Sequence, residues 1–333
     1  MKHIKSCIRA LIGAMAMTCA IASGTSAAAE FPQKGSTITL LVPYGPGGQI
    51  DVMGRAMAAY WDAKWGTRTI VLNKVGANNQ IALSELLRRP ADGHTIAFAQ
   101  GFEAQLTYLN PEANAPYSRS NFVPVALSQR TPAGWVVRAD SPYQTMTDLV
   151  KAAQAKPGTV TLGTPTSRGP AQLYIEEFDK KQKAKLNSVP FNDGPSMMNA
   201  LLGGHIDIAV TNPTIALPHL KSGRIRAIMV SGNTPSKFFP SVPTAGSLGL
   251  DISSFGASTG LTLARGTPAP VVQAWSTMLK ELSEDADMRA KMDAMGIQPE
   301  YAGPSDYAAL WDAMQVEVTK LLMRTQGKVR PIQ

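Results

Sequence analysis

The loops that join predicted strands to predicted helices carry the residues best suited to binding a ligand. After the apolar, β-branched run 37–43 comes the loop Tyr44-Gly45-Pro46-Gly47-Gly48, and Asp51 lies in the helical pattern that follows. Glycines let the backbone approach a ligand closely, and the N–H groups that open a helix favour an anion. The alternative is a plain strand-to-helix turn in which Asp51 complements the helix dipole.

Two further loops have the same character. The segment 164–169 offers hydroxyls and Arg168 after a strand, and the segment 211–214 places donors at a helix start. Arg168 could pair with a carboxylate through two hydrogen bonds, although an exposed solubilising arginine is an equal alternative. Three donor-rich loops at equivalent positions would face one another across a cleft, so together they predict an anion-binding clamp.

The patterns expected of a nucleotide-binding enzyme or a metalloenzyme are missing from the sequence. No Gly-x-x-x-x-Gly-Lys-Ser/Thr phosphate loop occurs, and residues 45–48 do not fit Gly-x-Gly-x-x-Gly. Beyond the first 29 residues the histidines His94, His205 and His219 are isolated from one another, and none has the spacing of a zinc site. We therefore expect no enzyme activity, no cofactor and no metal.

Residues 1–29 have the features of a secretory signal peptide. A basic head with Lys2 and Arg9 precedes the apolar run 10–22, and the alanines 27–29 provide a cleavage site. The run is shorter than the roughly 20 residues that span a bilayer, so we expect a soluble, exported protein. Both cysteines lie inside this leader. A cysteine-free exported chain suits an oxidising compartment.

Length and composition indicate the number of domains, and net charge bears on whether the protein binds nucleic acid. The chain has 333 residues, of which 44% are hydrophobic and 17% charged, which excludes a disordered chain and suggests two domains. The formal net charge is +8, and removal of the leader with its three positive residues leaves 29 basic and 24 acidic residues, or +5. This excess is spread along the chain without a basic run, so we expect no nucleic-acid partner.

Strand and helix patterns alternate along the chain, which predicts parallel, doubly wound α/β sheets. The predicted strands lie at 37–43, 69–72, 95–99, 135–137, 160–163, 188–191, 206–210, 225–230 and 254–263. The predicted helices lie at 50–60, 81–88, 146–155, 171–181, 196–202 and 215–221. The remainder after 263 is predicted to be helical, at 270–282, 286–295 and 306–323, and to pack back onto the first α/β unit. We therefore expect one domain from residues 30–130 and 255–333, and a second from 131–254.

The exported chain resembles, over essentially its whole length, the Bug family of periplasmic solute receptors, the TctC-like component of tripartite tricarboxylate transporters. Many short segments match in order, which makes the resemblance specific. They are 31–32, 38–48 with Asp51, Asn73, 76–77, 91–95, 189–191, 201–207, 216–227, 240–244 and 266–268.

The resemblance implies a type II periplasmic-binding-protein fold, a Venus flytrap of two α/β domains around a cleft. It further implies that the loop Tyr44 to Gly48 and the loop Thr211 to Thr214 grip one ligand carboxylate, mostly through backbone groups. Side chains near Gln100 to Glu103 and Thr164 to Arg168 would then set selectivity. The side-chain candidates implied in this way are Gln100, Phe102, Thr164, Thr166, Ser167, Arg168, Phe191, Thr211 and Asn212.

Three places depart from the pattern of the family. Arg168 and Gln172 stand where relatives often carry a Gly-Ser loop and a histidine, which adds a positive charge. Thr211 stands where receptors for amino acids place an acid, which argues against an ammonium-bearing ligand. The segment 73–79 reads Asn-Lys-Val-Gly-Ala-Asn-Asn and adds amide donors.

The leading hypothesis is a monomeric receptor that closes about a hinge on an organic carboxylate and delivers it to the permease subunits of a tripartite tricarboxylate transporter. The ligand would be a di- or tricarboxylate, or an aromatic carboxylate stacked near Tyr44 or Phe102. An alternative is a sensory subunit that presents the ligand to a membrane kinase. A secreted hydrolase is a third alternative, disfavoured because we expect neither a Gly-x-Ser-x-Gly nucleophile elbow nor a base in this sequence.

Overall fold

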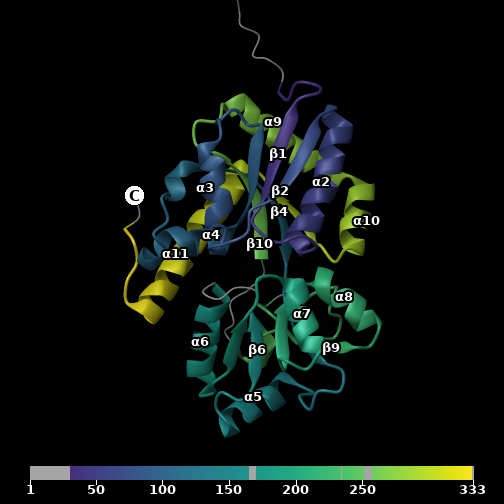
Figure 1. Ribbon diagram of the computed structural model, residues 1–333, viewed down its shortest axis with the longest axis vertical. Coiled ribbons are helices and arrows are strands. Elements are labelled where there is room, and N and C mark those ends of the chain that lie inside the picture. The colour runs from purple at the N-terminus through teal and green to yellow at the C-terminus, as the bar shows by residue number, and fades with distance from the viewer. Residues whose placement is uncertain (1–30, 165–169, 234, 251–256, 332–333) are drawn as a thin grey trace, which may run out of the picture.

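The computed structural model describes residues 31–164, 170–233, 235–250 and 257–331, which form two α/β lobes (Figure 1). The upper lobe of the figure contains residues 31–131 and 257–331, and the lower lobe contains residues 134–250 within these ranges. The sheet of the upper lobe has the strand order β11-β4-β10-β3-β1-β2, and that of the lower lobe β7-β6-β8-β5-β9. The predicted α/β fold with two sheets is confirmed. The predicted signal peptide lies outside the described residues, and the domain boundaries at 130/131 and 254/255 stay a prediction.

The strands and helices of the upper lobe come from both ends of the chain. They are β1 (Thr37–Val42), α2 (Gln49–Trp65), β2 (Arg68–Asn73), α3 (Gln80–Arg88), β3 (Thr95–Gln100), α4 (Gly101–Leu109), β4 (Phe122–Thr131), β10 (Ala257–Ala264), α9 (Ala269–Glu284), α10 (Ala286–Ala294), β11 (Pro299–Ala302) and α11 (Pro304–Gln326). Those of the lower lobe are β5 (Gly134–Arg138), α5 (Met146–Ala155), β6 (Thr161–Thr164), α6 (Pro170–Gln182), β7 (Asn187–Pro190), α7 (Gly194–Leu202), β8 (Ile208–Thr211), α8 (Pro213–Lys221) and β9 (Ile225–Val230).

Both sheets are mixed, so the prediction of parallel sheets is wrong in part. Strands β1, β2 and β3 pair in parallel, whereas β10 runs antiparallel to both β3 and β4, and β5 runs antiparallel to both β8 and β9. The reason is the path of the chain between the lobes. Strand β5 enters the lower lobe from the junction with the upper lobe, so it must run against β8, whose carboxyl end returns to that junction. Strand β10 enters the upper lobe in the same way.

Two elements differ from the sequence-based expectation. The segment after 263 is not wholly helical, because residues 299–302 form β11 and pair antiparallel with β4. Its sequence Pro-Glu-Tyr-Ala has no strand-like alternation, and all four residues are half-buried. Helix α4 follows β3 without an intervening loop, although this segment was expected to be a ligand-binding loop.

Helices cover both faces of each sheet, as a doubly wound fold requires. In the upper lobe α3, α4 and α11 bury one apolar cluster against the sheet, and α2, α9 and α10 bury another. On the second face Trp61 of α2 and Trp275 of α9 meet edge to face, with ring centroids 4.8 Å apart. In the lower lobe α5 and α6 cover one face, and α7 and α8 cover the other. Because the helices hold both faces, the strand ends at the junction are held rigidly.

Gly260 of β10 tests how tightly the upper sheet is packed. A Cβ added there would lie 2.3 Å from the Ala126 carbonyl oxygen and 2.4 Å from the Tyr307 ring, and the carbonyl belongs to a sheet that cannot move aside. We expect Gly260→Ala to lower the free energy of unfolding by about 2–4 kcal/mol. Gly163→Ala is the matched comparison, since its Cβ would meet only the side chains of Ile206 and Met197. Chemical denaturation of both variants checks this, and equal losses would contradict it.

Candidate functional site

Three helices begin close together where the two lobes meet. Their N-caps are Gly48 for α2, Asp193 for α7 and Asn212 for α8. A Cβ on Gly45 would lie 3.7 Å from the Cβ of Asp193, across the lobes, and a Cβ on Gly194 would touch Ile215. The first N–H groups of a helix have no partner within it, so three helix starts in one place favour an anion. We call this region the lobe junction.

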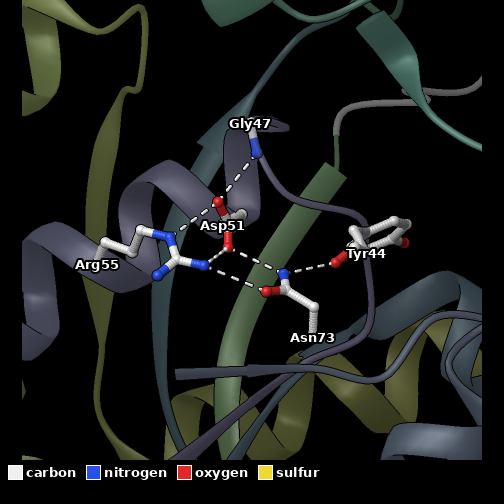
Figure 2. Close-up of polar contacts among 5 residues, drawn as sticks. All are labelled: Tyr44, Gly47, Asp51, Arg55 and Asn73. Carbon is white, nitrogen blue, oxygen red and sulfur yellow. Dashed lines mark hydrogen bonds and ion pairs between the residues drawn. The ribbon is translucent and has the colours of Figure 1, made fainter. Parts of the chain in front are cut away.

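The loop of residues 44–48 is held by side chains from α2 and β2 (Figure 2). The Gly47 N–H donates to Asp51 Oδ2 at 3.0 Å, and Gly47 itself has a φ of +78°, which favours glycine. Asn73 Nδ2 donates to the Tyr44 carbonyl at 2.8 Å and to Asp51 Oδ1 at 2.9 Å. The loop is therefore fixed from both of its ends before any ligand arrives.

Asp51 stabilises the loop, and both of its carboxylate oxygens accept hydrogen bonds from other residues of the protein. Arg55, one helical turn further on, donates from Nε to Oδ2 at 3.0 Å and from Nη2 to Oδ1 at 2.9 Å. Burial raises the pKa of Asp51, but the hydrogen bonds from Arg55, Gly47 and Asn73 outweigh it and hold the pKa below its ordinary value. The Asp51 side chain is 3% exposed. These contacts favour a positioning role, and the predicted direct contact with a ligand stays a prediction.

Behind the loop lies a second buried carboxylate, Glu103 of α4. Tyr44 donates a short hydrogen bond from its hydroxyl to Glu103 Oε2, and Asn79 Nδ2 donates to the same oxygen at 3.0 Å. Burial raises the pKa of Glu103 above its ordinary value of 4.5, in spite of the two donated hydrogen bonds. Burial, followed by the neighbouring Glu103, likewise raises the pKa of the Tyr44 hydroxyl. The cluster of Tyr44, Asn79 and Glu103 therefore fixes the Tyr44 side chain.

The loop between β8 and α8 supplies the lower side of the lobe junction. Asn212 caps α8 by accepting from the Ile215 N–H at 3.3 Å. Thr211 is 4% exposed, and the Oγ1 atoms of Thr211 and Thr214 are buried without a hydrogen-bond partner in the part of the chain that the structure describes. Buried hydroxyls are normally paired, so two unpaired ones at a helix start are hydrogen-bonding capacity available to a ligand or water.

The two lobes touch beside this loop. Gly296, which follows α10, lies against the start of α8, because a Cβ there would be 2.8 Å from Pro213 C and from Thr214 N. Nearby, Lys237 Nζ of the lower lobe lies 2.6 Å from Asp293 Oδ1 of α10. Both of these side chains are about half exposed, so the ion pair adds little stability. The two lobes can approach this closely because Gly296 has no side chain.

The remaining predicted site residues lie at several different places. Gln100 ends β3, opposite Thr259 of β10, and Phe102 packs half-buried on the upper core. Thr164 is buried at the end of β6, and its carbonyl accepts from the Phe191 N–H at 2.8 Å. Thr166, Ser167 and Arg168 lie outside the described residues. Pro46 is exposed at the tip of its loop.

Several residues of the lobe junction were missed from the sequence. Arg55 and Asp193 had local signals, since Asp51 and Arg55 have the i, i+4 spacing of a helical ion pair, and Asp193 stands before Gly-Pro-Ser at a helix start. Glu103 and Asn79 lie in the segments 100–103 and 73–79 that were named from the sequence, but their contact with Tyr44 was not predicted. Gly296 had no signal, because its partner is distant in the sequence.

The described residues offer no catalytic or metal centre. The expectation that the sequence has no Gly-x-Ser-x-Gly segment is wrong, because residues 256–260 have this spacing. Ser258 nevertheless lies within β10 and pairs with β4, whereas a nucleophile elbow is a strand-to-helix turn. Its Oγ lies 3.6 Å from Met314 Sδ. Within the described ranges no three His, Cys, Asp or Glu side chains gather as a metal site would require. None of the helices described has both the length and the apolar character to cross a bilayer.

Glu103 generates a prediction about pH. The folded state holds the Glu103 proton more tightly than the unfolded state, so wild type gains stability as the pH falls through the window between the raised pKa and 4.5. Above that window wild type carries the whole cost of a buried charge. We expect Glu103→Gln to be more stable than wild type at pH 7 by roughly 1–3 kcal/mol, and this difference to shrink towards pH 4.5.

Thermal unfolding of both proteins between pH 4 and 8 measures this difference. Glu284, which is exposed at the end of α9, supplies the control, and Glu284→Gln should change stability by less than about 0.5 kcal/mol at any pH. A Glu103→Gln variant that is less stable than wild type at pH 7 would contradict the prediction.

Comparison with known proteins identifies the family and supports the fold. Residues 53–326 match the family described as "Tripartite tricarboxylate transporter family receptor", TctC. Protein BugT of Bordetella pertussis is 27% identical over 297 residues, which are 89% of this chain and 90% of that protein. A Rhodopseudomonas palustris protein solved with adipate has a TM-score of 0.81 at 23% identity and covers 90% of this chain and 99% of its own.

The MatC protein of Rhodopseudomonas palustris, solved with bound malate, has a TM-score of 0.77 at 22% identity and covers 86% of this chain and 99% of its own. These structures share the two-domain periplasmic-binding-protein fold. The family consists of periplasmic binding proteins, not enzymes. Because the family match spans most of the chain, this protein belongs to the Bug and TctC family of solute-binding receptors.

Proposed function

We propose that this receptor binds an organic carboxylate at the lobe junction. The observation that carries the proposal is the meeting of three helix starts with two buried, unpaired threonine hydroxyls. These groups are hydrogen-bond donors. Of the two carboxylates beside them, Asp51 is paired with Arg55, and Asp193 caps α7 by accepting from the Ser196 N–H at 2.7 Å. A negatively charged ligand group would therefore bind to the donors at the starts of α2 and α8.

The ligand class we favour is a di- or tricarboxylate. Two structural neighbours were solved with the dicarboxylates adipate and malate, which supports this choice. Tyr44 is held by Glu103 and Asn79, so an aromatic ligand would have to stack on a ring that is already packed. Arg168, outside the described residues, remains the proposed counter-charge for a second carboxylate.

Binding is proposed to close the lobes about the strands that join them, in an exported, monomeric receptor. Delivery of the ligand to the permease subunits of a tripartite tricarboxylate transporter is supported by the family match. The alternative of a sensory subunit has no observation in its favour.

A thermal-shift screen of residues 30–333 tests the ligand class. The panel contains mono-, di-, tri- and aromatic carboxylates and amino acids, and a ligand that binds only the folded state raises the melting midpoint by mass action. We expect a shift confined to di- or tricarboxylates. The variant Gly48→Trp should lose the shift. A Cβ at Gly48 has room, and the tryptophan ring would fill the space beside the loop where the ligand is proposed to bind. Shifts with amino acids alone would refute the proposal.

The hinge proposal makes a separate prediction. Gly296→Leu should prop the lobes apart, because its side chain would collide with the backbone of Pro213 and Thr214. We expect ligand affinity to fall by about tenfold or more and the ligand-induced decrease in radius of gyration to disappear. Gly223→Leu is the matched control, since Gly223 has a similar φ of +68° but no neighbour within 4 Å. Small-angle scattering with and without ligand measures the radius and the monomer mass. Equal behaviour of the two variants would contradict closure at this contact.

A further inference from the structure

A second concave site lies on the upper lobe, apart from the lobe junction. It is a cavity of about 110 Å³ between the end of α4, the segment 116–121, α11 and residues 330–331. Helices α4 and α11 lie side by side on the left of the upper lobe in Figure 1. A space of this size holds several waters or one small molecule of a few heavy atoms. None of its lining residues is among the residues predicted to bind the carboxylate.

The lining of this cavity is positive. It contains Arg119 and Arg330 and no aspartate or glutamate. Arg119 Nε donates to Asp312 Oδ1 at 3.1 Å, and its guanidinium lies 5.1 Å from the centre of the Trp311 ring, so its charge is partly compensated. Arg330 Nη1 donates to the Ala115 carbonyl at 2.6 Å and has no acidic partner among the described residues. Within the described residues, the exposed Arg330 thus brings to the cavity a positive charge that has no acidic counter-charge.

A buried hydroxyl adds hydrogen-bonding capacity. Tyr117 lines the cavity and is 3% exposed, and within the described residues its hydroxyl has no hydrogen-bond partner. The neighbouring Tyr108 is satisfied, since its hydroxyl donates to Gln315 Oε1 at 2.9 Å. A buried hydroxyl without a partner is rare and costly unless water or a ligand supplies one.

We propose that this cavity is a second anion site, which takes a small oxyanion such as inorganic phosphate or a short carboxylate. The Arg330 guanidinium supplies the charge and the Tyr117 hydroxyl supplies a hydrogen bond. The volume of about 110 Å³ suits a small oxyanion better than a nucleotide. The backbone N–H of Arg330 donates to the Leu109 carbonyl at 2.7 Å, which links the C-terminal segment to the end of α4. An anion bound to the Arg330 side chain would strengthen this link.

Calorimetric titration of residues 30–333 with inorganic phosphate, and separately with acetate, tests the proposal. Gly48→Trp serves as the background, because it fills the lobe junction and leaves the second site untouched. We expect saturable binding of at least one anion in this background. Arg330→Ala should weaken it by about tenfold or more, since a charge-assisted hydrogen bond is lost. Arg224→Ala, which removes an exposed arginine of the lower lobe, is the matched control and should bind as the background does.

Tyr117→Phe separates binding from folding. The variant removes a hydroxyl that has no partner within the described protein, so it should keep the melting temperature while weakening the anion severalfold. The proposal is overturned if neither anion binds the Gly48→Trp protein, or if Arg330→Ala and Tyr117→Phe bind as tightly as the control. Neither result would bear on the lobe junction, whose ligand is tested in the wild-type protein.

Discussion

The crossing of the chain between the two lobes is the constraint from which the site follows. Strand β4 ends and β10 begins side by side, with Thr131 opposite Ala257, and β5 leaves the same place into the lower lobe. Strands β1, β3, β6 and β8 consequently end at the junction, and the helices that follow them begin there. In open α/β sheets the carboxyl ends of strands are where ligands bind. Two sheets arranged end to end bring two such edges together.

Carboxylates close to an anion site oppose the binding of an anion, and the protein holds Asp51 and Glu103, which lie near this junction, in different ways. Asp51 stays ionised and is covered by Arg55, Asn73 and the Gly47 N–H, so its charge is cancelled locally while it shapes the loop. Glu103 has no cationic partner among its described contacts, and burial favours its neutral form. Both arrangements lower the negative potential that a bound carboxylate would meet.

The sequence predicts the local parts of this architecture well. Alternating strand and helix patterns locate most of the elements, and helix α5 is found at its observed bounds because Thr145 and Asp148 form a capping box. The Tyr44 to Gly48 loop is correctly located at a strand end. The predicted loop 211–214 is shorter in the structure, because Thr211 ends β8, Asn212 caps α8, and Pro213 and Thr214 lie in α8.

The features that the sequence does not predict depend on contacts between residues that are distant in the chain. Strand direction fails for β5 and β10, because hydrophobic patterns are the same in parallel and antiparallel strands. Helix α4 reads as a loop since its polar residues Glu103 and Gln105 are buried by contacts from other parts of the chain. The Gly296 contact depends on how two lobes meet, which no local pattern encodes.

The convergence of helix starts at the junction has a consequence for the ionic conditions under which such a receptor works. At 0.1 M salt, the attraction between exposed charges is largely screened beyond about 10 Å, whereas interactions with backbone N–H groups enclosed between two lobes are screened far less. A carboxylate held by α2, α7 and α8 would therefore stay bound as the salinity of the surrounding fluid changes, whereas a ligand held by surface lysines would be released.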